Sequence, residues 1–378
     1  MRYNNALIII VINVTPTVIF SAGIWKIPHL STFLPEYQLS KKSAGAQAVI
    51  GWGLRPSTHK ARAHAKQHGL PFVALEDGFL RSLGLGVAGY PPFSIVHDDV
   101  GIYYDTTRPS RLENLILVNH INANMLAEAE RARALIVAEQ LSKYNHAPVC
   151  AEHLIKLDQA AVLVLDQTFG DMAIRYGGAD ADTFENMLTA AVSENPHAQI
   201  YVKTHPDVLS GKKKGYLKTE RLSAPNVTIL AEDINPISLL QQVDKVYCVT
   251  SHMGFEALLC GKPVVTFGLP WYAGWGVTDD RHASVGELLT TNRRAPRSLM
   301  QLFAAAYLQY SRYINPNTGE RGTVFDVVDY LANARRLTDK LCGHLYCVGM
   351  SLWKRAVMKP VFNVPSCKLH VVSSLKKF

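Results

Sequence analysis

Short runs of apolar and β-branched residues alternate along the chain with longer stretches of helical character. This alternation is typical of an α/β fold built around parallel sheets. The run AVLVL at residues 161–165 has no polar residue, as expected for a strand covered on both faces. Strands are expected at residues 17–20, 48–52, 72–75, 161–165, 199–203, 245–249 and 263–267. Helices are expected at residues 58–68, 122–140, 183–194 and 253–261, at a segment opened by Asn235-Pro236, and from Ser298 to about Leu345.

The expected elements form two α/β series that divide near residue 150. A chain of 378 residues is too long for one ordinary core and suits two domains of about 150 residues with additions. We therefore predict two Rossmann-like domains that face a common cleft, followed by C-terminal helices. The predicted parts are an N-terminal extension (1–16), an N-terminal Rossmann-like domain (17–150), a C-terminal Rossmann-like domain (151–297), a helical segment (298–357), and a basic tail or the start of a missing second module (358–378).

The segment 6–24 is rich in Ile and Val but is a poor membrane span. A spanning helix needs about 20 mostly apolar residues, and Asn13, Pro16 and Ser21 interrupt this segment. A signal peptide would need a more basic start. We expect a short extension followed by a buried strand, with a targeting or anchoring segment as the alternative.

Basic residues are concentrated in two places. The formal net charge is +8, no acidic residue follows Asp339, and a second basic cluster is Lys212-Lys213-Lys214. Such patches suit anionic lipid headgroups or phosphates, although a solvated basic tail explains them equally well. Because the charge is local, we expect no nucleic-acid partner.

The six cysteines are sparse for the length and show no paired metal-binding spacing. Cys248 and Cys260 lie in apolar runs and are expected to be core thiols. This usage suggests a reducing compartment, hence the cytosol.

Polar residues follow four of the expected strands. Glu76-Asp77, Asp166, His205 and Ser251 each come directly after an expected strand. Ligands of open α/β sheets bind at the carboxyl ends of the strands. We therefore expect these groups to line one cleft, although each alone is as consistent with a turn or a helix cap.

The acidic positions suit two catalytic roles. Glu76, beside Asp77, can act as general acid or base for an attacking hydroxyl, and Gly78 lets the backbone turn close to a substrate. Asp166, with Asp171 five residues on, can act as a nucleophile. Two successive inversions at one carbon then give net retention.

The remaining candidates suit an anionic leaving group. Lys203 and His205 can stabilise the phosphate of a sugar nucleotide by charge and by hydrogen bond. Ser251, after Thr250, adds a hydroxyl at a helix start, where backbone N–H groups favour an anion. Glu256 on that helix can reach a ribose hydroxyl or face solvent.

The sequence predicts neither a metal nor a cofactor. Asp98-Asp99 resembles an acidic metal pair, but Val100-Gly101 follows and no further ligand completes a coordination set. There is no phosphate-loop signature and no GxGxxG at a strand–helix turn. The glycine-rich segment 84–89 suits a flexible active-site loop.

Six longer segments carry a family resemblance. They are GIWKIPHL (Gly23–Leu30), LEDGFLRSLGLG (Leu75–Gly86), GIYYDTTRPSRLE (Gly101–Glu113), LDQTFGD (Leu165–Asp171), YVKTHPDVLSGKKKGYL (Tyr201–Leu217) and TSHMGFEALLCGKPVVTFGLPWYAGWG (Thr250–Gly276). They resemble one module of the capsular polysaccharide proteins that transfer β-linked Kdo from CMP-Kdo. The order of the Glu-Asp-Gly, His-Pro and Thr-Ser motifs is similar, more distantly, to that of bacterial CMP-sialic acid transferases.

The resemblance implies a glycosyltransferase-B fold and a retaining, metal-independent transfer of Kdo. The enzyme would use CMP-Kdo to build the poly-Kdo linker of a capsular polysaccharide on a (lyso)phosphatidylglycerol acceptor. The N-terminal domain would hold this glycolipid acceptor, and the C-terminal domain would hold the CMP-sugar. The protein would be cytoplasmic and peripheral on the inner face of the inner membrane of a Gram-negative bacterium, with a capsule assembly or export complex as a further partner.

The resemblance also implies which residues catalyse the transfer. Glu76 is expected to be the acid/base, and Asp166 the nucleophile that forms a Kdo–enzyme adduct. The secondary candidates are Asp77, Asp171 and Thr250.

Five residues are expected to bind the donor. The resemblance implies that His205 and Ser251 contact the CMP phosphate, with Lys203 in support. Glu256 would contact the ribose. Arg81 is expected to pair with the Kdo carboxylate on the ground of its charge.

Two alternatives stay open at this point. One is another CMP-sugar transferase of the sialic acid type, and the other is a non-catalytic capsule export or assembly component. A chain that had lost catalysis would be expected to lose Glu76, Asp166 or His205, and all three are present. Members of the family often carry two modules in tandem. One complete module is expected here, as a fragment, a natural single-module enzyme or a truncated gene product, and it would make one of the linkages.

Overall fold

The structure is a computed structural model that describes residues 14–156, 158–204, 215–217 and 225–345. In the last helix, side chains are described up to residue 337. The described residues up to Ala332 form one compact unit, and those from Asn333 onward form a second. His205, the Lys212-Lys213-Lys214 cluster and the basic tail lie outside the described residues.

The first sheet has seven strands in the order β13-β12-β5-β4-β3-β1-β2. The strands from β2 to β4 run parallel, whereas β5, β12 and β13 are added antiparallel. The strands are β1 (Thr15–Ile19), β2 (Tyr37–Ser40), β3 (Ala48–Trp52), β4 (Phe72–Asp77), β5 (Ser94–Asp98), β12 (Ser311–Ile314) and β13 (Arg321–Gly322).

The second sheet has six strands, all parallel, in the order β11-β10-β9-β6-β7-β8. Its strands are β6 (Ala161–Leu165), β7 (Gln199–Lys203), β8 (Val227–Leu230), β9 (Lys245–Cys248), β10 (Val264–Thr266) and β11 (Asp279–Asp280). Strand β6 is buried along its whole length, as its apolar sequence predicted.

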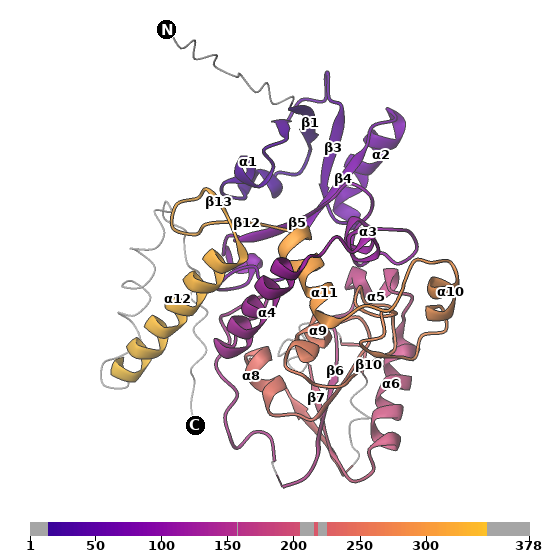
Figure 1. Ribbon diagram of the computed structural model, residues 1–378, viewed down its shortest axis with the longest axis vertical. Coiled ribbons are helices and arrows are strands. Elements are labelled where there is room, and N and C mark those ends of the chain that lie inside the picture. The colour runs from indigo at the N-terminus through magenta and orange to yellow at the C-terminus, as the bar shows by residue number, and fades with distance from the viewer. Residues whose placement is uncertain (1–13, 157, 205–214, 218–224, 346–378) are drawn as a thin grey trace, which may run out of the picture. The chain divides into compact units, whose positions relative to one another are not determined.

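Helices connect the strands of both sheets (Figure 1). The α-helices are α1 (Leu30–Phe33), α2 (His59–Gln67), α3 (Arg111–Val118), α4 (Ala123–Ala138), α5 (Met172–Tyr176), α6 (Ala181–Glu194), α8 (Pro236–Gln241), α9 (His252–Leu259), α10 (Val285–Thr290), α11 (Leu299–Phe303) and α12 (Val324–Leu345). Short 3-10 turns are η1 (Ile24–Lys26), η2 (Pro56–Thr58) and η3 (Gly86–Ala88), and η5 (Ala304–Tyr310) is a π-helix. In Figure 1, α4 and α11 lie side by side between the two sheets.

Local signals in the sequence placed several of these elements correctly. Strands β3, β6 and β7 have the predicted bounds. The long helix predicted at residues 122–140 is α4, whose cap Asn122 accepts a hydrogen bond from the Met125 N–H. Asn235 caps α8 in the same way, with Pro236 at the first helical position.

The prediction of continuous helix from Ser298 to about Leu345 was wrong. Helix α11 and η5 are followed by β12, which pairs antiparallel with β5. A strand of four residues has too little periodicity to be recognised, and its partner lies far earlier in the chain. Pairing across this distance, rather than local propensity, decides its conformation. The predicted border between the domains 17–150 and 151–297 stays a prediction.

The limits of four predicted strands also differ from the sequence-based expectation: β9 and β10 by one residue at one or both ends, and β1 and β4 by more. Strand β4 does not stop at Leu75 but continues through Glu76 and Asp77, which pair with Val96 and Ile95 of β5. Strand β1 begins at Thr15, so the predicted extension at 1–16 overlaps the sheet. The acidic pair therefore belongs to the strand and is held by sheet hydrogen bonds.

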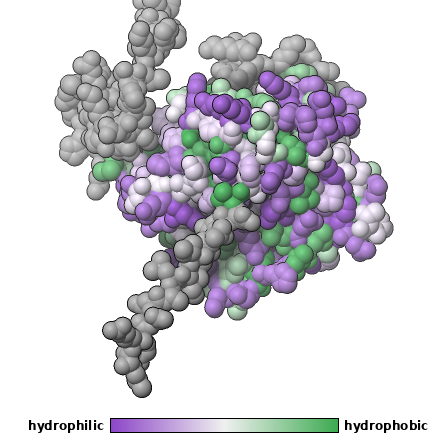
Figure 2. Space-filling view, turned by 90° about the horizontal axis from the view of Figure 1, so that it is seen from above, coloured by the Kyte–Doolittle hydropathy of each residue, from purple (hydrophilic) through white to green (hydrophobic). Residues whose placement is uncertain are grey.

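The described cysteines Cys150, Cys248 and Cys260 are free thiols. Cys248 is fully buried, which confirms its assignment to the core, whereas Cys260 is partly exposed. Seen from above, the described surface is mainly hydrophilic, with hydrophobic residues in small groups (Figure 2). Within the described part of the chain, no helix is both long enough and apolar enough to cross a bilayer.

An aromatic cluster packs the loop after β4 against the second sheet and η5. Phe79 is buried. Its ring centroid lies 5.0 Å from that of His252, 5.3 Å from that of Trp271 and 5.5 Å from that of Tyr307. Aromatic pairs at such separations contribute about 0.5–1.5 kcal/mol each beyond their buried area. The cluster therefore fixes the chain that follows the acidic end of β4.

A buried ion network joins α3 to the segment before α11. Glu113 and Arg294 are each only 4% exposed and form an ion pair. Arg293 donates from Nε to Glu113 Oε1 at 2.9 Å. Arg297 adds hydrogen bonds to two carbonyls at the end of α3, those of Ile116 and Leu117. Because the charges are buried, each needs its partner.

Replacing Glu113 with Ala is expected to lower the free energy of unfolding by about 3–5 kcal/mol, since it leaves the Arg294 guanidinium buried without a counter-charge. The matched control is Asp99→Ala, which removes a more exposed pair with Arg111 and should cost about 0–1 kcal/mol. Urea unfolding measures both. Equal losses in the two variants would contradict the structural role of the Glu113 network.

Candidate active site

A cavity of about 750 Å³ is lined by segments that follow strands of both sheets. From the first sheet come the loop after β3 and the end of β4. From the second come the loop after β6 and the start of α9, and the turn at residues 143–144 completes the wall. The predicted site residues that line it are Glu76, Asp77, Asp171, Thr250 and Ser251.

Glu76 is a buried carboxyl at the end of β4, 7% exposed. Trp52 donates from Nε1 to its Oε1 at 2.8 Å. Gly53 has a φ of 52°, and a Cβ there would lie 2.9 Å from Glu76 Oε2, so only glycine allows this close approach. Burial, followed by the charge of Asp77, raises the pKa of Glu76. Such a carboxyl can hold a proton at a pH where an exposed one is ionised.

Asp77 lies beside Glu76 but is engaged by other side chains. Arg81 donates from Nε to Asp77 Oδ1 at 2.5 Å, and Tyr144 donates from its hydroxyl to Oδ2 at 3.1 Å. Arg81 also donates to Ser82 Oγ at 2.8 Å and to the Tyr90 carbonyl at 3.0 Å. Arg81 is 6% exposed and does not line the cavity.

The glycine-rich segment predicted as an active-site loop packs on Arg81. A Cβ on Gly86 would lie 2.6 Å from Arg81 Nη2, so a larger residue here would require the Arg81 guanidinium to shift. Residues 84–89 do not line the cavity. The loop therefore contributes to the site by enclosing the arginine that pairs with Asp77.

Asp166 directly follows β6, as predicted, and does not line the cavity although its neighbour Gln167 does. Its Oδ1 accepts hydrogen bonds from the backbone N–H groups of Gln167, Tyr216 and Leu217 at 2.9, 3.0 and 3.3 Å. Its Oδ2 accepts one from the Thr204 hydroxyl at 3.0 Å. Burial raises the pKa of Asp166 overall, although these hydrogen bonds act to lower it.

Gln167 joins the loop after β6 to the start of α9. Its Oε1 accepts a hydrogen bond from the Thr250 backbone N–H at 3.0 Å. Ser251 caps α9, with Oγ accepting from the Met253 N–H at 3.3 Å. Asp171 caps α5 through the Ala173 N–H at 3.0 Å. Ser251 and Thr250 thus present hydroxyls at a helix start, where an anion is favoured.

Two further predicted donor contacts lie away from the cavity lining. Lys203 donates from Nζ to the carbonyls of Thr204 and Glu232 at 3.2 and 2.9 Å. Glu256 is buried in α9, where it accepts hydrogen bonds from Ser142 Oγ at 2.6 Å and from the Lys143 N–H at 3.3 Å. The structure therefore gives both side chains protein partners.

Among the cavity-lining residues that sequence reasoning missed are Tyr103, Tyr104, Lys143 and His252. The tyrosines and His252 lie within the long segments that carried the family resemblance, so those segments contained a usable signal. Lys143 lies outside them, in a turn between α4 and β6, and no local pattern indicated it. Burial, followed by the charge of Lys143, lowers the pKa of His252 to about 3, so this imidazole is neutral.

The acidic pair Asp98-Asp99, which superficially resembled a metal site, binds other groups of the protein. Asp98 Oδ1 accepts hydrogen bonds from the N–H groups of Val100 and Gly101, and Oδ2 accepts one from the Tyr310 hydroxyl. Asp99 binds the guanidinium of Arg111 with both oxygens. Among the residues that the structure describes, no cluster of three or more His, Cys, Asp or Glu is placed to hold a metal.

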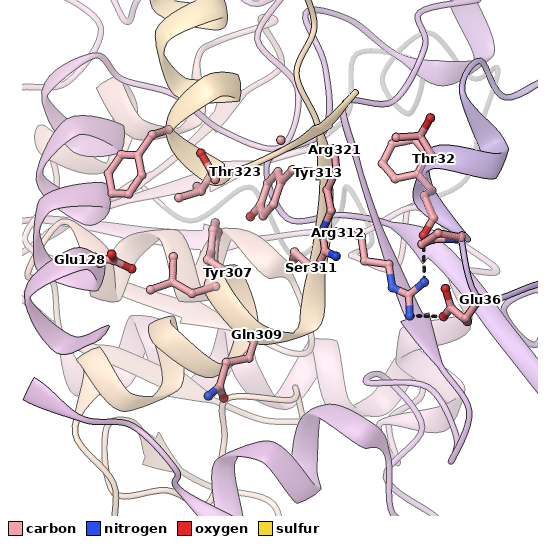
Figure 3. A pocket seen from close by; sticks show the side chains of 16 residues that line it. Thr32, Glu36, Glu128, Tyr307, Gln309, Ser311, Arg312, Tyr313, Arg321 and Thr323 are labelled. Carbon is pink, nitrogen blue, oxygen red and sulfur yellow. Dashed lines mark hydrogen bonds and ion pairs between the residues drawn. The ribbon is translucent and has the colours of Figure 1, made fainter. Parts of the chain in front are cut away.

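A second cavity of about 540 Å³ lies beside β12 and contains none of the predicted site residues (Figure 3). There the guanidinium of Arg312 points at Glu36 and donates to its carboxylate at 2.6 Å. Burial alone would raise the pKa of Glu36, but Arg312 lowers it overall. Since this acid is ionised and paired, the first cavity, with Glu76, is the better candidate for proton transfer.

Two Rossmann-like sheets around a cavity with a buried acid place the chain in the glycosyltransferase-B class of fold. The family model for the capsule polysaccharide biosynthesis protein matches residues 47–161 and 150–313. The chain belongs to this family.

Curated relatives include the capsule polysaccharide modification protein LipA of Neisseria meningitidis serogroup A, 68% identical over 94% of this chain. The chain spans about half the length of that relative, 51%. The lipopolysaccharide-processing protein LpsZ of Rhizobium meliloti is 39% identical over 76% of this chain and 64% of its own length.

Two solved structures are similar over most of this chain. The Thermosulfurimonas dismutans KpsC beta Kdo 2,4 transferase is 45% identical with a TM-score of 0.77, over 84% of this chain and 98% of its own. The KpsC beta Kdo 2,7 transferase of the same organism is 27% identical with a TM-score of 0.61, over 85% and 99%. The predicted glycosyltransferase-B fold and the family assignment are confirmed.

Glu256 should make stability depend on pH. Burial raises the pKa of Glu256 from 4.5 to about 7, so the unfolded chain loses this proton first as pH rises. Its contribution to stability is complete below about pH 4.5 and is lost by about pH 7, up to about 3 kcal/mol. The free energy of unfolding of the wild type, measured relative to that of Glu256→Gln, should therefore decrease as the pH is raised from about 4.5 to about 7. A difference that stays constant from pH 4.5 to 8 would contradict the raised pKa.

Proposed function

We propose that this chain is a retaining β-Kdo glycosyltransferase that uses CMP-Kdo to extend the poly-Kdo linker on a phosphatidylglycerol-type glycolipid in capsule biosynthesis. The observation that carries the proposal is the 45% identity to the KpsC beta Kdo 2,4 transferase, over 98% of that chain, together with the cavity around Glu76. The relatives named LipA are about twice as long, so the proposal concerns the module that this chain represents.

The two similar structures differ in the linkage that their names give. Identity is 45% to the 2,4 transferase and 27% to the 2,7 transferase. We therefore assign the 2,4 linkage to this chain. A glycolipid acceptor puts the reaction at the inner face of the inner membrane, where a capsule assembly or export complex takes up the product.

The first step of the proposed mechanism forms a covalent adduct. An oxygen of the Asp166 carboxylate attacks the anomeric carbon of Kdo, and the bond from that carbon to the phosphate oxygen of CMP breaks. CMP leaves with the electron pair of this bond. Thr250 and Ser251 supply hydroxyls from the cavity wall to the phosphate, with His205 and Lys203 as the further predicted contacts. Asp166 Oδ2 accepts one hydrogen bond from the described residues, so it is the oxygen better suited to attack.

The second step transfers the sugar to the acceptor. A hydroxyl of the acceptor attacks the anomeric carbon, its proton passes to the ionised Glu76 carboxylate, and the bond to Asp166 breaks. The raised pKa of Glu76 brings its basicity closer to working pH, which favours this proton transfer. Two inversions at the same carbon retain the configuration. No metal or cofactor takes part in the proposed steps.

The donor is tested by following CMP release with a Kdo-bearing lipid mimic as acceptor. The proposal expects release from CMP-Kdo and none from CMP-sialic acid. Release from CMP-sialic acid alone would replace the substrate while keeping the reaction class. Binding of CMP without release from either donor would favour a non-catalytic component.

Replacing Glu76 with Gln is expected to lower turnover of CMP-Kdo by about 10²- to 10⁴-fold, because the amide cannot accept the proton of the acceptor. The fold should persist at neutral pH, since Gln can still accept the Trp52 hydrogen bond and removes a buried charge. The control is Glu152→Gln at an exposed position, which should leave turnover unchanged. Normal activity of Glu76→Gln in a CMP-release assay would eliminate the acid/base role.

Asp166 is tested in the Glu76→Gln background, where the first step proceeds and the second is slow. Incubation with CMP-Kdo should accumulate a Kdo–enzyme adduct, and peptide mass spectrometry should locate it at Asp166. The double variant with Asp166→Ala should form no adduct. An adduct at another residue, or none in either protein, would overturn the assignment of the nucleophile.

A further inference from the structure

Lys143 lines the cavity and has a backbone that is fixed from two sides. Its carbonyl accepts hydrogen bonds from the N–H groups of Arg81 and Ser82 at 3.1 and 3.4 Å. Its own N–H donates to Glu256 Oε1 at 3.3 Å, and Ser142 Oγ donates to the same oxygen at 2.6 Å. The turn that carries Lys143 is therefore held both by the loop after β4 and by α9.

The Lys143 ammonium is a half-buried cation with donors available to a ligand. Burial alone would lower the pKa of Lys143, but the neighbouring tyrosines and the Glu76-Asp77 pair raise it overall, so it stays protonated. Within the part of the chain that the structure describes, no group accepts a hydrogen bond from its Nζ. Its described ring contact is with Tyr144, whose centroid lies 5.8 Å from Nζ.

Two other cations near the predicted site, among the residues that the structure describes, are already engaged. Arg81 gives its guanidinium to Asp77, Ser82 and the Tyr90 carbonyl, and does not line the cavity. Lys203 donates to two backbone carbonyls and is likewise absent from the cavity lining. Arg55, which does line the cavity, is exposed on the loop after β3. Among the described residues that line the cavity with Glu76, Lys143 is the cation that is partly buried.

The chemistry of the donor indicates what Lys143 recognises. If the chain uses CMP-Kdo, its donor carries two anionic groups: a phosphate in the leaving group and a carboxylate on the reacting carbon itself. The Thr250 and Ser251 hydroxyls at the start of α9 suit the phosphate. The Lys143 carbonyl is bound by the loop that directly follows Glu76 and Asp77, and Lys143 lines the same cavity as Glu76. Glu76 takes the proton of the acceptor hydroxyl that attacks the reacting carbon, so Lys143 suits the carboxylate on that carbon.

We propose that Lys143 binds the carboxylate of the donor sugar and so selects a sugar acid over a neutral sugar. This inference rests on the proposed function. An ammonium–carboxylate hydrogen bond in a partly buried site is worth about 1.5–3 kcal/mol, or roughly 10- to 100-fold in kcat/KM. Lys143 takes the role that charge alone had suggested for Arg81, because the guanidinium of Arg81 already has protein partners.

The test compares the full chain with its Lys143→Met and Lys143→Arg variants. For CMP-Kdo, kcat/KM should fall roughly 10- to 100-fold in Lys143→Met and recover in part in Lys143→Arg, which keeps the charge. The Kd of CMP alone, measured by calorimetry, should be unchanged in both. Lys66→Met, at an exposed position in α2, is the matched control and should behave as the wild type.

Each other outcome overturns the inference in a different way. An equal loss of affinity for CMP would assign Lys143 to the phosphate. An unchanged kcat/KM in Lys143→Met would remove it from donor recognition while leaving the proposed function intact. A wild-type protein that releases no CMP from CMP-Kdo would end the proposed function and this inference with it. If Lys143→Met does not fold, Lys143→Gln takes its place in the same assays.

Discussion

One buried carboxylate, that of Glu256 in α9, holds the turn on which the cavity depends. It accepts hydrogen bonds from Ser142 Oγ at 2.6 Å and from the Lys143 N–H at 3.3 Å. In the same turn, the Lys143 carbonyl accepts hydrogen bonds from the backbone N–H groups of Arg81 and Ser82, which lie in the loop after β4. Burial of a carboxyl is unfavourable to its charge, which is why the pKa of Glu256 rises to about 7 despite these hydrogen bonds. One side chain thus joins walls that come from both sheets.

Packing and charge pairing act around this turn in complementary ways. The aromatic cluster around Phe79 is held by ring packing and sets the position of the loop after β4. The Glu113 network with Arg293 and Arg294 is ionic and sets the orientation of α3. Apolar contacts supply much of the free energy of folding. A buried ion pair mainly destabilises conformations in which its two charges are separated.

Two glutamates of this protein, Glu76 and Glu36, differ in pKa because their environments differ. Glu76 accepts a hydrogen bond from the neutral Trp52 N–H, and burial, followed by the charge of the neighbouring Asp77, raises its pKa. Glu36 has Arg312 as partner, so its pKa is lowered overall even though burial acts in the opposite direction. The first arrangement suits proton transfer and the second suits structure. The same comparison separates Lys143, which has no described acceptor, from Arg81, which has three.

The sequence by itself determined the elements whose signals are local. The apolar run of β6 and the caps Asn122 and Asn235 depend on neighbours in the chain, and the long family segments identified the fold class. Only the tertiary structure decided that β12 pairs with β5 and that Lys143 enters the cavity. It also decided that Arg81 and Glu256 bind protein groups. These outcomes depend on hydrogen bonds between residues far apart in the chain, and no periodicity or capping pattern encodes such pairings.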